Sequence, residues 1–137
     1  MLVRDAMTPV AVTVGPDHTL RDAARAMATR RVGAAVVNDP DGPGVGIVTE
    51  RDVLTALADG ADPDVETVAA HLTAELVFAA PTWSLDQAAE AMVRGGFRHL
   101  VVLDAGEVAG VLAMRDLVRA WTTQRAAQPR DPATARA

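Results

Sequence analysis

An apolar run meets a helix start in Gly46-Ile47-Val48-Thr49-Glu50-Arg51-Asp52. Thr49 and Asp52 have the spacing of a capping box, in which the side chain of each residue bonds to the backbone N–H of the other. A related stretch, Gly110-Val111-Leu112-Ala113-Met114-Arg115-Asp116, begins 64 residues later. This separation is too long for a local period, so it indicates a duplicated unit of the chain.

The duplication extends beyond this stretch. Thr19 and Asp22 form another candidate capping box, and Ser84 and Gln87 repeat it 65 residues later. Three apolar helix positions recur with the same offset, where Leu20, Ala24 and Met27 match Leu85, Ala89 and Met92. The same order of elements is therefore expected in both halves of the chain.

Each unit is predicted to run strand, helix, strand, strand, helix. In the first unit the periodicity predicts a helical turn at 3–8, strands at 10–14, 34–37 and 46–48, a helix from Thr19 that Gly33 ends, and a helix at 51–58. The last helix of the chain is expected to begin at Arg115 and to continue past Trp121.

We predict an α+β fold in which two tandem repeats pack face to face about a pseudo-two-fold axis, because one unit of about 60 residues has too small a core to be stable alone. The repeats are placed at residues 1–62 and 63–125. Residues 126–137 are expected to form a disordered tail, since the sequence from Gln128 has no hydrophobic periodicity. Clefts between the repeats would lie near helix N-termini, which favour anions.

The composition narrows the classes of function. A net charge of −5 at pH 7 argues against nucleic-acid binding, which needs a basic face. The absence of cysteine excludes thiolate metal sites and cysteine nucleophiles. No apolar run approaches the roughly 18 residues of a membrane span, and no signal-peptide pattern is found. We therefore expect a cytoplasmic protein with neither a nucleic-acid nor a membrane partner.

Three motifs resemble the cystathionine beta-synthase (CBS) domain, namely Asp5-Ala6-Met7-Thr8, Thr19-Leu20-x-x-Ala23 and Gly46-Ile47-Val48-Thr49-x-x-Asp52. Two such domains in tandem resemble the Bateman module, and the resemblance covers residues 3–122. The layout is also similar to that of small stand-alone actinobacterial proteins of the hypoxic-response type. The resemblance implies a regulatory module that binds AMP, ADP, ATP or S-adenosylmethionine between its repeats and requires no cofactor.

The resemblance also implies roles for residues of the first cleft. In the family, the aspartate of the motif binds the ribose hydroxyls, a role that falls on Asp52, with Thr49 supporting the sugar or phosphate. Arg98 and His99 stand where nucleotide-binding members carry basic residues that face the phosphates. Phe97 and the apolar strand openings would contact the adenine.

The second cleft departs from the family pattern. Asp116 is retained beside Arg115, but Ala113 stands where the family has Thr or Ser. The positions that would face them are Gly33 and Ala34, with Arg30 and Arg31 as the nearest basic residues. We expect one competent cleft at most, with the second empty or weak.

Structural explanations stay open for these residues. Thr49 and Asp52 are fully explained as a helix cap. Against this, Asp116 persists where Ala113 has removed the cap partner, so the acid is retained without its box. The basic pair after Phe97 is explained equally well as one exposed and one packed side chain before a buried strand.

The sequence gives little support for metal binding or for nucleophilic catalysis. His71 and Glu75 are four residues apart, but a metal site needs at least one more ligand, so no metal is expected. Ser84 is the only serine, and the repeat explains it as a helix N-cap. Without a nucleophile beside a base, we expect no enzymatic activity.

A second function class competes with ligand binding. In this alternative the nucleotide cleft is vestigial, and exposed apolar helical faces make the module a dimeric interaction scaffold. The family resemblance implies pairing through helices, here those near residues 20–30 and 51–58 and their repeats. A homodimer is expected under both interpretations, with an unidentified protein as a possible further partner.

Overall fold

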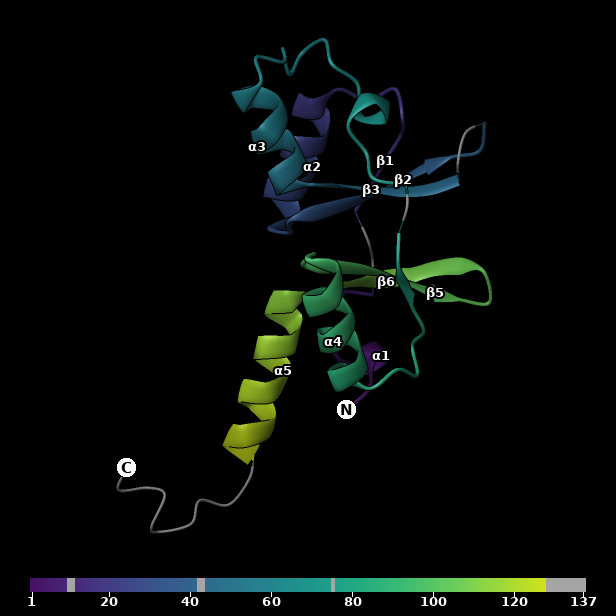
Figure 1. Ribbon diagram of the computed structural model, residues 1–137, viewed down its shortest axis with the longest axis vertical. Helices are drawn as coiled ribbons and strands as arrows, with labels where there is room; N and C mark the ends of the chain where they lie inside the picture. The colour runs from purple at the N-terminus through teal and green to yellow at the C-terminus, as the bar shows by residue number, and fades with distance from the viewer. Residues whose placement is uncertain (10–11, 42–43, 75, 128–137) are drawn as a thin grey trace, which may run out of the picture.

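The computed structural model describes residues 1–9, 12–41, 44–74 and 76–127. Two three-stranded sheets lie against each other in the middle of the molecule, with one pair of helices above and one pair below (Figure 1). The first half contains β1 (Thr13–Val14), α2 (Leu20–Arg30), β2 (Ala34–Asp39), β3 (Gly44–Thr49) and α3 (Glu50–Ala58). The second half contains β4 (Phe78–Ala79), α4 (Leu85–Gly95), β5 (His99–Asp104), β6 (Glu107–Ala113) and α5 (Met114–Ala127).

The two sheets have the same topology. In each sheet the middle strand runs parallel to the first and antiparallel to the third. The register pairs Ala34 with Thr49 in one sheet and His99 with Ala113 in the other. The predicted α+β fold with two repeats is thus confirmed, and equivalent positions lie at equivalent strand ends.

Capping boxes begin three of the four long helices, as predicted. The Thr19 and Ser84 side chains accept from the N–H groups of Asp22 and Gln87, at 3.1 Å in both boxes. Thr49 caps α3 in the same way. The spacing of these short polar residues was therefore a reliable signal for where each helix begins.

The prediction that Gly33 ends the first helix is wrong. Helix α2 ends at Arg30, and Arg31 takes the left-handed conformation with φ of 56°. Gly96 occupies the equivalent position after α4, with φ of 70°. Gly33 instead lies immediately before β2, where its carbonyl oxygen accepts from the N–H of Glu50 at 2.9 Å.

Two further predicted boundaries differ from the structure. Helix α5 continues through Ala127 and so occupies the first two residues of the predicted 126–137 tail. The remainder of that tail, 128–137, lies outside the described residues. In the predicted strand 10–14 only Thr13 and Val14 are extended, and residues 10 and 11 are likewise outside the described ranges.

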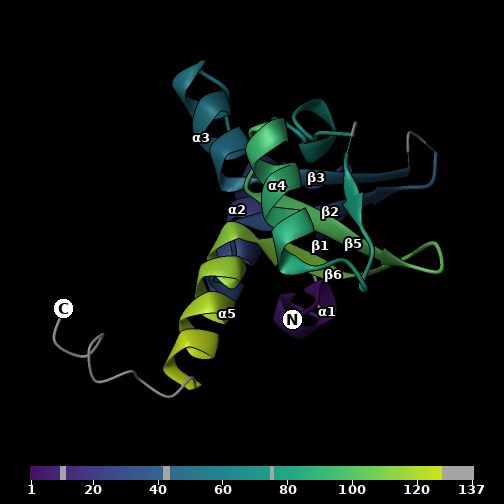
Figure 2. The same cartoon turned by 60° about the horizontal axis from the view of Figure 1, so that its bottom comes forward.

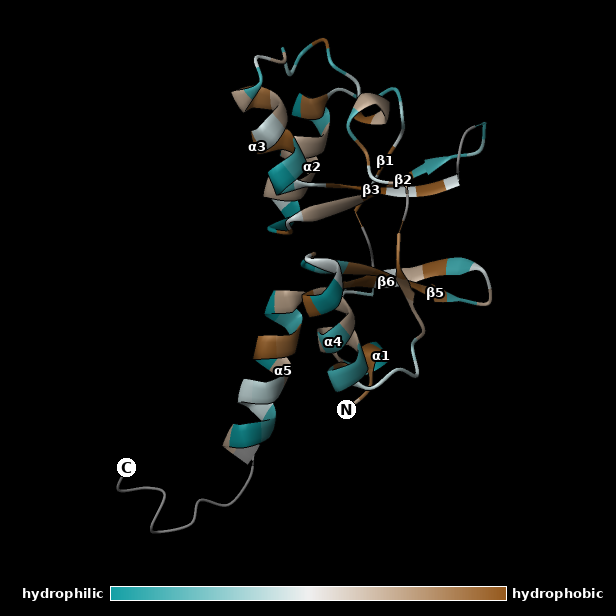
Figure 3. Cartoon of the chain, viewed as in Figure 1, coloured by the Kyte–Doolittle hydropathy of each residue, from teal (hydrophilic) through white to brown (hydrophobic). Residues whose placement is uncertain are grey.

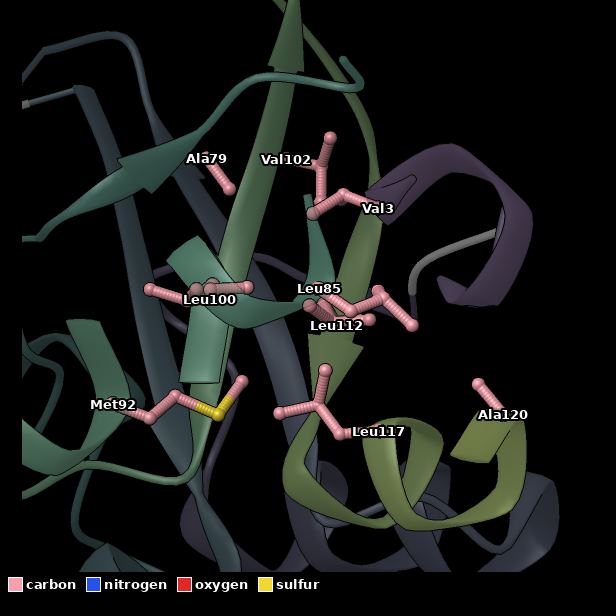
Figure 4. Packing of buried hydrophobic residues seen from close by; sticks show 10 residues of the cluster. Val3, Ala79, Leu85, Met92, Leu100, Val102, Leu112, Leu117 and Ala120 are labelled. Carbon is pink, nitrogen blue, oxygen red and sulfur yellow. The ribbon is translucent and has the colours of Figure 1, made fainter. Parts of the chain in front are cut away.

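The first turn of each repeat packs on the opposite repeat. Helix α1 (Val3–Ala6) lies in the lower half of the molecule, in contact with α5 (Figures 1 and 2). Val3 is fully buried there, and its N–H donates to the carbonyl of Trp83 at 2.8 Å. Figure 4 shows Val3 pointing toward Val102 and Leu112 from the purple helix.

The equivalent segment of the second repeat packs in the same way on the first repeat. The short helix η1 (Val68–Ala70) packs on the first repeat, where Val68 is fully buried and its N–H donates to the carbonyl of His18 at 2.7 Å. An ion pair between Arg21 and Asp64 holds the segment before η1 against α2. The packing units are therefore interlaced across the predicted boundary between residues 62 and 63.

Aliphatic side chains fill the cores. Each repeat has its own buried cluster, and a third cluster with Ala34, Ile47 and Val101 at its centre joins the two sheets. The strands between the helix pairs are coloured hydrophobic over much of their length (Figure 3). Among the described residues, no helix is both long and apolar enough to cross a membrane.

Candidate functional site

Two pockets open where the repeats meet, and equivalent residues of the two repeats line them. The larger has a volume of about 630 Å³ and the smaller about 370 Å³. The five residues predicted for the first cleft all line the larger pocket: Thr49, Asp52, Phe97, Arg98 and His99. Those predicted for the second cleft all line the smaller one: Asp116, Arg115, Gly33 and Ala34.

Asp52 serves the helix cap with one carboxylate oxygen. Its Oδ2 accepts from the Thr49 N–H at 2.8 Å and from the Thr49 hydroxyl at 3.0 Å. The Asp52 N–H in turn donates to Thr49 Oγ1 at 3.2 Å. Within the described part of the chain, Oδ1 makes no hydrogen bond. The cap is thus confirmed, and it leaves one oxygen of a half-buried carboxylate on the pocket wall for a further donor.

The opposite wall comes from the second repeat. Phe97, Arg98 and His99 follow α4 and lead into β5, so the turn after that helix aims them at the seam between the sheets. Arg98 is exposed, whereas Phe97 and His99 are half-buried. An apolar ring and a guanidinium therefore stand across the pocket from the Asp52 carboxylate.

His99 lies between the two pockets and lines both. Burial lowers the pKa of His99, and this is the largest effect. The nearby Glu50 and Asp116 carboxylates favour the charged ring and offset only part of the shift. Arg115 and Arg98 lower the pKa further. Burial between the repeats therefore disfavours the charged form of the ring. The role that the resemblance implies for His99, facing the phosphates of a ligand, stays a prediction.

Sequence reasoning missed two parts of this pocket. The first is Glu50, whose side chain lies next to Gly33 together with the ring of His99. A Cβ atom added at Gly33 would be 2.9 Å from Glu50 Oε1 and 3.3 Å from His99 Nε2. Thr73 also lines the wall, because it pairs with Ile47 of β3. The match of Thr73 to Thr8, which lines the smaller pocket, was the signal that could have identified it.

Asp116 retains half of a cap. Its Oδ2 accepts from the Ala113 N–H at 2.8 Å, although Ala113 has no hydroxyl to return the bond. The Asp116 side chain is buried, with 7% of its surface exposed. The reciprocal box is thus missing, as the sequence indicated, but the acid still has a structural role, so its retention alone is no sign of ligand binding.

The smaller pocket is also more basic than predicted. Arg115 and Arg119 of α5 line it together with Arg30 and Arg31 at the end of α2. Sequence reasoning overlooked Arg119, although it stands one helical turn after Arg115 and so shares its face of the helix. The sequence placed Arg30, Arg31 and Arg115 at or near this cleft, and the structure adds Arg119 to them.

The family model of the CBS domain matches residues 3–59 and 65–122. The chain belongs to the CBS domain family. The CBS domain-containing protein YhcV of Bacillus subtilis is 34% identical over 116 residues, which are 84% of this chain and 81% of that protein. Other curated relatives are longer. The chain spans 41% of an uncharacterized protein of Methanocaldococcus jannaschii and 18% of a CBS domain-containing protein of Arabidopsis thaliana.

Solved structures of CBS proteins share the fold. A CBS domain protein from Pyrobaculum aerophilum, complexed with AMP, matches with a TM-score of 0.79 at 32% identity over 93% of this chain and 100% of that chain. Hypoxic Response Protein I, with two coordinated zinc ions, matches with a TM-score of 0.72 at 26% identity over 87% of this chain and 98% of that chain. The predicted resemblance to tandem CBS proteins is confirmed.

Metal-binding chemistry is sparse in the described part of this CBS protein. No group of three or more His, Asp or Glu side chains that could hold a metal ion occurs in residues 1–9, 12–41, 44–74 and 76–127. His71 Nε2 lies 2.9 Å from Glu66 Oε2. The other acid considered as its partner, Glu75, lies outside the described ranges.

Proposed function

We propose that this tandem CBS module is a sensor that binds an adenosine-containing ligand reversibly in the larger pocket. One observation carries the proposal: in the described part of the chain Asp52 Oδ1 makes no hydrogen bond, and Asp52 lines the same pocket as Phe97 and Arg98. A carboxylate oxygen suits a ribose hydroxyl, and a ring and an arginine suit a base and a phosphate.

Among AMP, ADP, ATP and S-adenosylmethionine, the charges of this pocket favour AMP. Arg51 and Arg98 line it together with Glu50 and Asp52, so its fixed charges balance. A ligand with a long phosphate chain would bring negative charge that the lining leaves unmatched. The similarity to a CBS protein complexed with AMP supports the same choice.

The proposed mechanism is regulatory rather than catalytic. A ligand here would contact α3 of the first repeat and the start of β5 of the second, so binding would change the free energy of their relative orientation. A protein partner that contacts both repeats would sense the change. The proposal places the module in the cytoplasm, where adenine nucleotides are abundant.

Exposed apolar residues favour a homodimer under this proposal. Leu54 and Leu57 on α3 are 67% and 45% exposed, and their repeat equivalents Val118 and Trp121 on α5 are 55% and 41% exposed. Such faces are typical of surfaces that a second copy covers. They equally support the alternative function, a dimeric scaffold with a vestigial cleft.

Isothermal titration calorimetry with AMP tests the proposal through a matched pair of variants. Asp52→Ala and Asp22→Ala each remove the acid of a capping box, which costs about 1 kcal/mol of stability in both. Only Asp52 lines a pocket. We expect Asp52→Ala to weaken AMP binding at least about tenfold, since a hydrogen bond to a charged group is lost, and Asp22→Ala to leave it unchanged.

Two outcomes would contradict the proposal. The first is an equal loss of affinity in both variants, which would reduce Asp52 to a cap. The second is no heat with any of the four candidate ligands, combined with a dimer in light scattering that Leu54→Arg dissociates. That combination would favour the scaffold.

A further inference from the structure

The two pockets differ in charge although the duplication relates them. Two arginines and two carboxylates line the larger pocket, so their formal charges cancel. Four arginines and a single carboxylate, Asp116, line the smaller pocket, with a surplus of three positive charges. The whole chain carries −5 at pH 7. The smaller pocket is therefore a concentrated basic site on an acidic protein.

The surplus arises at positions where the repeats differ. Arg31 stands where the larger pocket has Gly96, and Arg119 occupies the position that is Thr55 on α3. Arg30, the last residue of α2, has a simple structural role, because a cation near a helix C-terminus is favourable. Arg115 has no such explanation, since it lies in the first turn of α5, where a cation opposes the helix dipole.

Few internal partners hold these guanidinium groups. The only ion pair among them in the described residues joins Arg119 Nη1 to Asp116 Oδ1 at 3.9 Å, the outer limit for such a pair. Side chains that carry like charge around one cavity repel each other unless an anion lies between them. An anion in the pocket would relieve this repulsion and accept from several guanidinium groups at once.

The same pocket is poorly suited to a nucleoside. Val32 stands at the position of Phe97, so the aromatic surface is missing, and Ala113 supplies no hydroxyl. Asp116 is buried and its Oδ1 lies 3.9 Å from Arg119 Nη1, which leaves it less available to a ribose than the half-buried Asp52. The volume of about 370 Å³ is also smaller.

We propose that the smaller pocket binds a compact polyphosphate anion of the pyrophosphate and triphosphate class, held by Arg30, Arg31, Arg115 and Arg119 without an adenosine group. The chain would then have two chemically distinct sites. The larger pocket takes a ligand with sugar and base, and the smaller one takes a phosphate chain. His99 lines both pockets, so an occupant of either site lies against the same ring.

Calorimetric titration of the full chain with inorganic triphosphate tests this proposal. The double variant Arg31→Gly/Arg119→Thr gives the smaller pocket the residues of the larger one, and glycine suits the left-handed backbone at position 31. The control Arg25→Gln/Arg125→Gln removes the same charge from exposed positions outside the pocket. We expect the first variant to bind triphosphate at least about tenfold more weakly and the control to remain within about twofold of the wild type.

Further arms separate this site from the nucleotide site. Asp52→Ala should retain triphosphate binding even if AMP binding is lost, and adenosine should not displace triphosphate. If Arg31→Gly/Arg119→Thr is unstable, Arg30→Gln/Arg115→Gln replaces it with the same expected loss. The proposal is overturned if triphosphate does not bind, if the control loses as much affinity as the pocket variant, or if Asp52→Ala abolishes binding.

Discussion

Val3 and Val68 occupy equivalent positions in the two repeats, and each is fully buried in the core of the opposite repeat. Val3 packs with the cluster around Leu85 and Leu112, and Val68 with the cluster around Val14 and Val48. Neither core is complete without a residue from the other half. We therefore expect the chain to unfold in a single cooperative transition.

Truncation of Val3 and truncation of Val68 should lower the free energy of unfolding by the same amount. Val3→Ala and Val68→Ala each remove two buried methyl groups, so we expect a loss of about 2 kcal/mol in the free energy of unfolding. Urea denaturation monitored by circular dichroism measures the loss. Val65→Ala is the control, because Val65 is 71% exposed in the same segment as Val68. Two separate transitions in the wild type would contradict the interlaced packing.

Fragments should follow the packing rather than the predicted boundary. A peptide of residues 1–62 lacks Val68 and η1, whereas one of residues 12–74 contains the whole first core. We expect the second fragment to keep more secondary structure by circular dichroism, although both are small enough to be only marginally stable. A better-folded 1–62 fragment would show that η1 is dispensable.

The glycines that open the two related stretches should differ in sensitivity. A Cβ atom at Gly110 would lie 2.3 Å from the carbonyl oxygen of Thr8, and one at Gly46 would lie 3.0 Å from that of Thr73. Since backbone cannot move aside as a side chain can, we expect Gly110→Ala to cost about 3 kcal/mol and Gly46→Ala about 1 kcal/mol. The melting temperatures of the two variants measure this difference. If Gly46→Ala were the more destabilising substitution, the close contact between Thr8 and β6 would be refuted.

Stability should fall when the pH drops through the range in which histidine titrates. Burial holds the pKa of His99 below its ordinary value of 6.5, so below pH 6.5 the unfolded chain takes up the proton that the folded ring resists. The free energy of unfolding therefore decreases as the pH falls from 6.5 toward the folded pKa and is unaffected above this window. The His99→Gln variant should lose less unfolding free energy than the wild type over that pH window. Chemical denaturation at several pH values measures the difference.

Local patterns carried most of the fold prediction. Thr19, Thr49 and Ser84 located three helix starts, because a capping box depends on residues only three apart. The helix end at Gly33 was mispredicted since Arg31 adopts a conformation that glycine normally provides. The packing of Val3 and Val68 in the core of the opposite repeat was not predicted. No local sequence pattern shows which of two cores buries a given valine.

The candidate site was predicted unevenly for similar reasons. Asp52 and Arg98 were brought together by the repeat and the family resemblance, and the structure places both on the larger pocket. The lowered pKa of His99 could not be predicted, because it depends on burial between two repeats that are distant in sequence. Arg119 was overlooked although the helical period places it beside Arg115.

The exchanged first turn of the chain also bears on how the protein forms during synthesis. Val3 leaves the ribosome well before its partners, which extend to Leu117 and Ala120 of α5. Val3 therefore stays without its full set of partners, with its apolar side chain unprotected, until α5 has been translated. The first half can close earlier, once residues up to about 73 have emerged, so the nascent chain is expected to complete its two cores in that order.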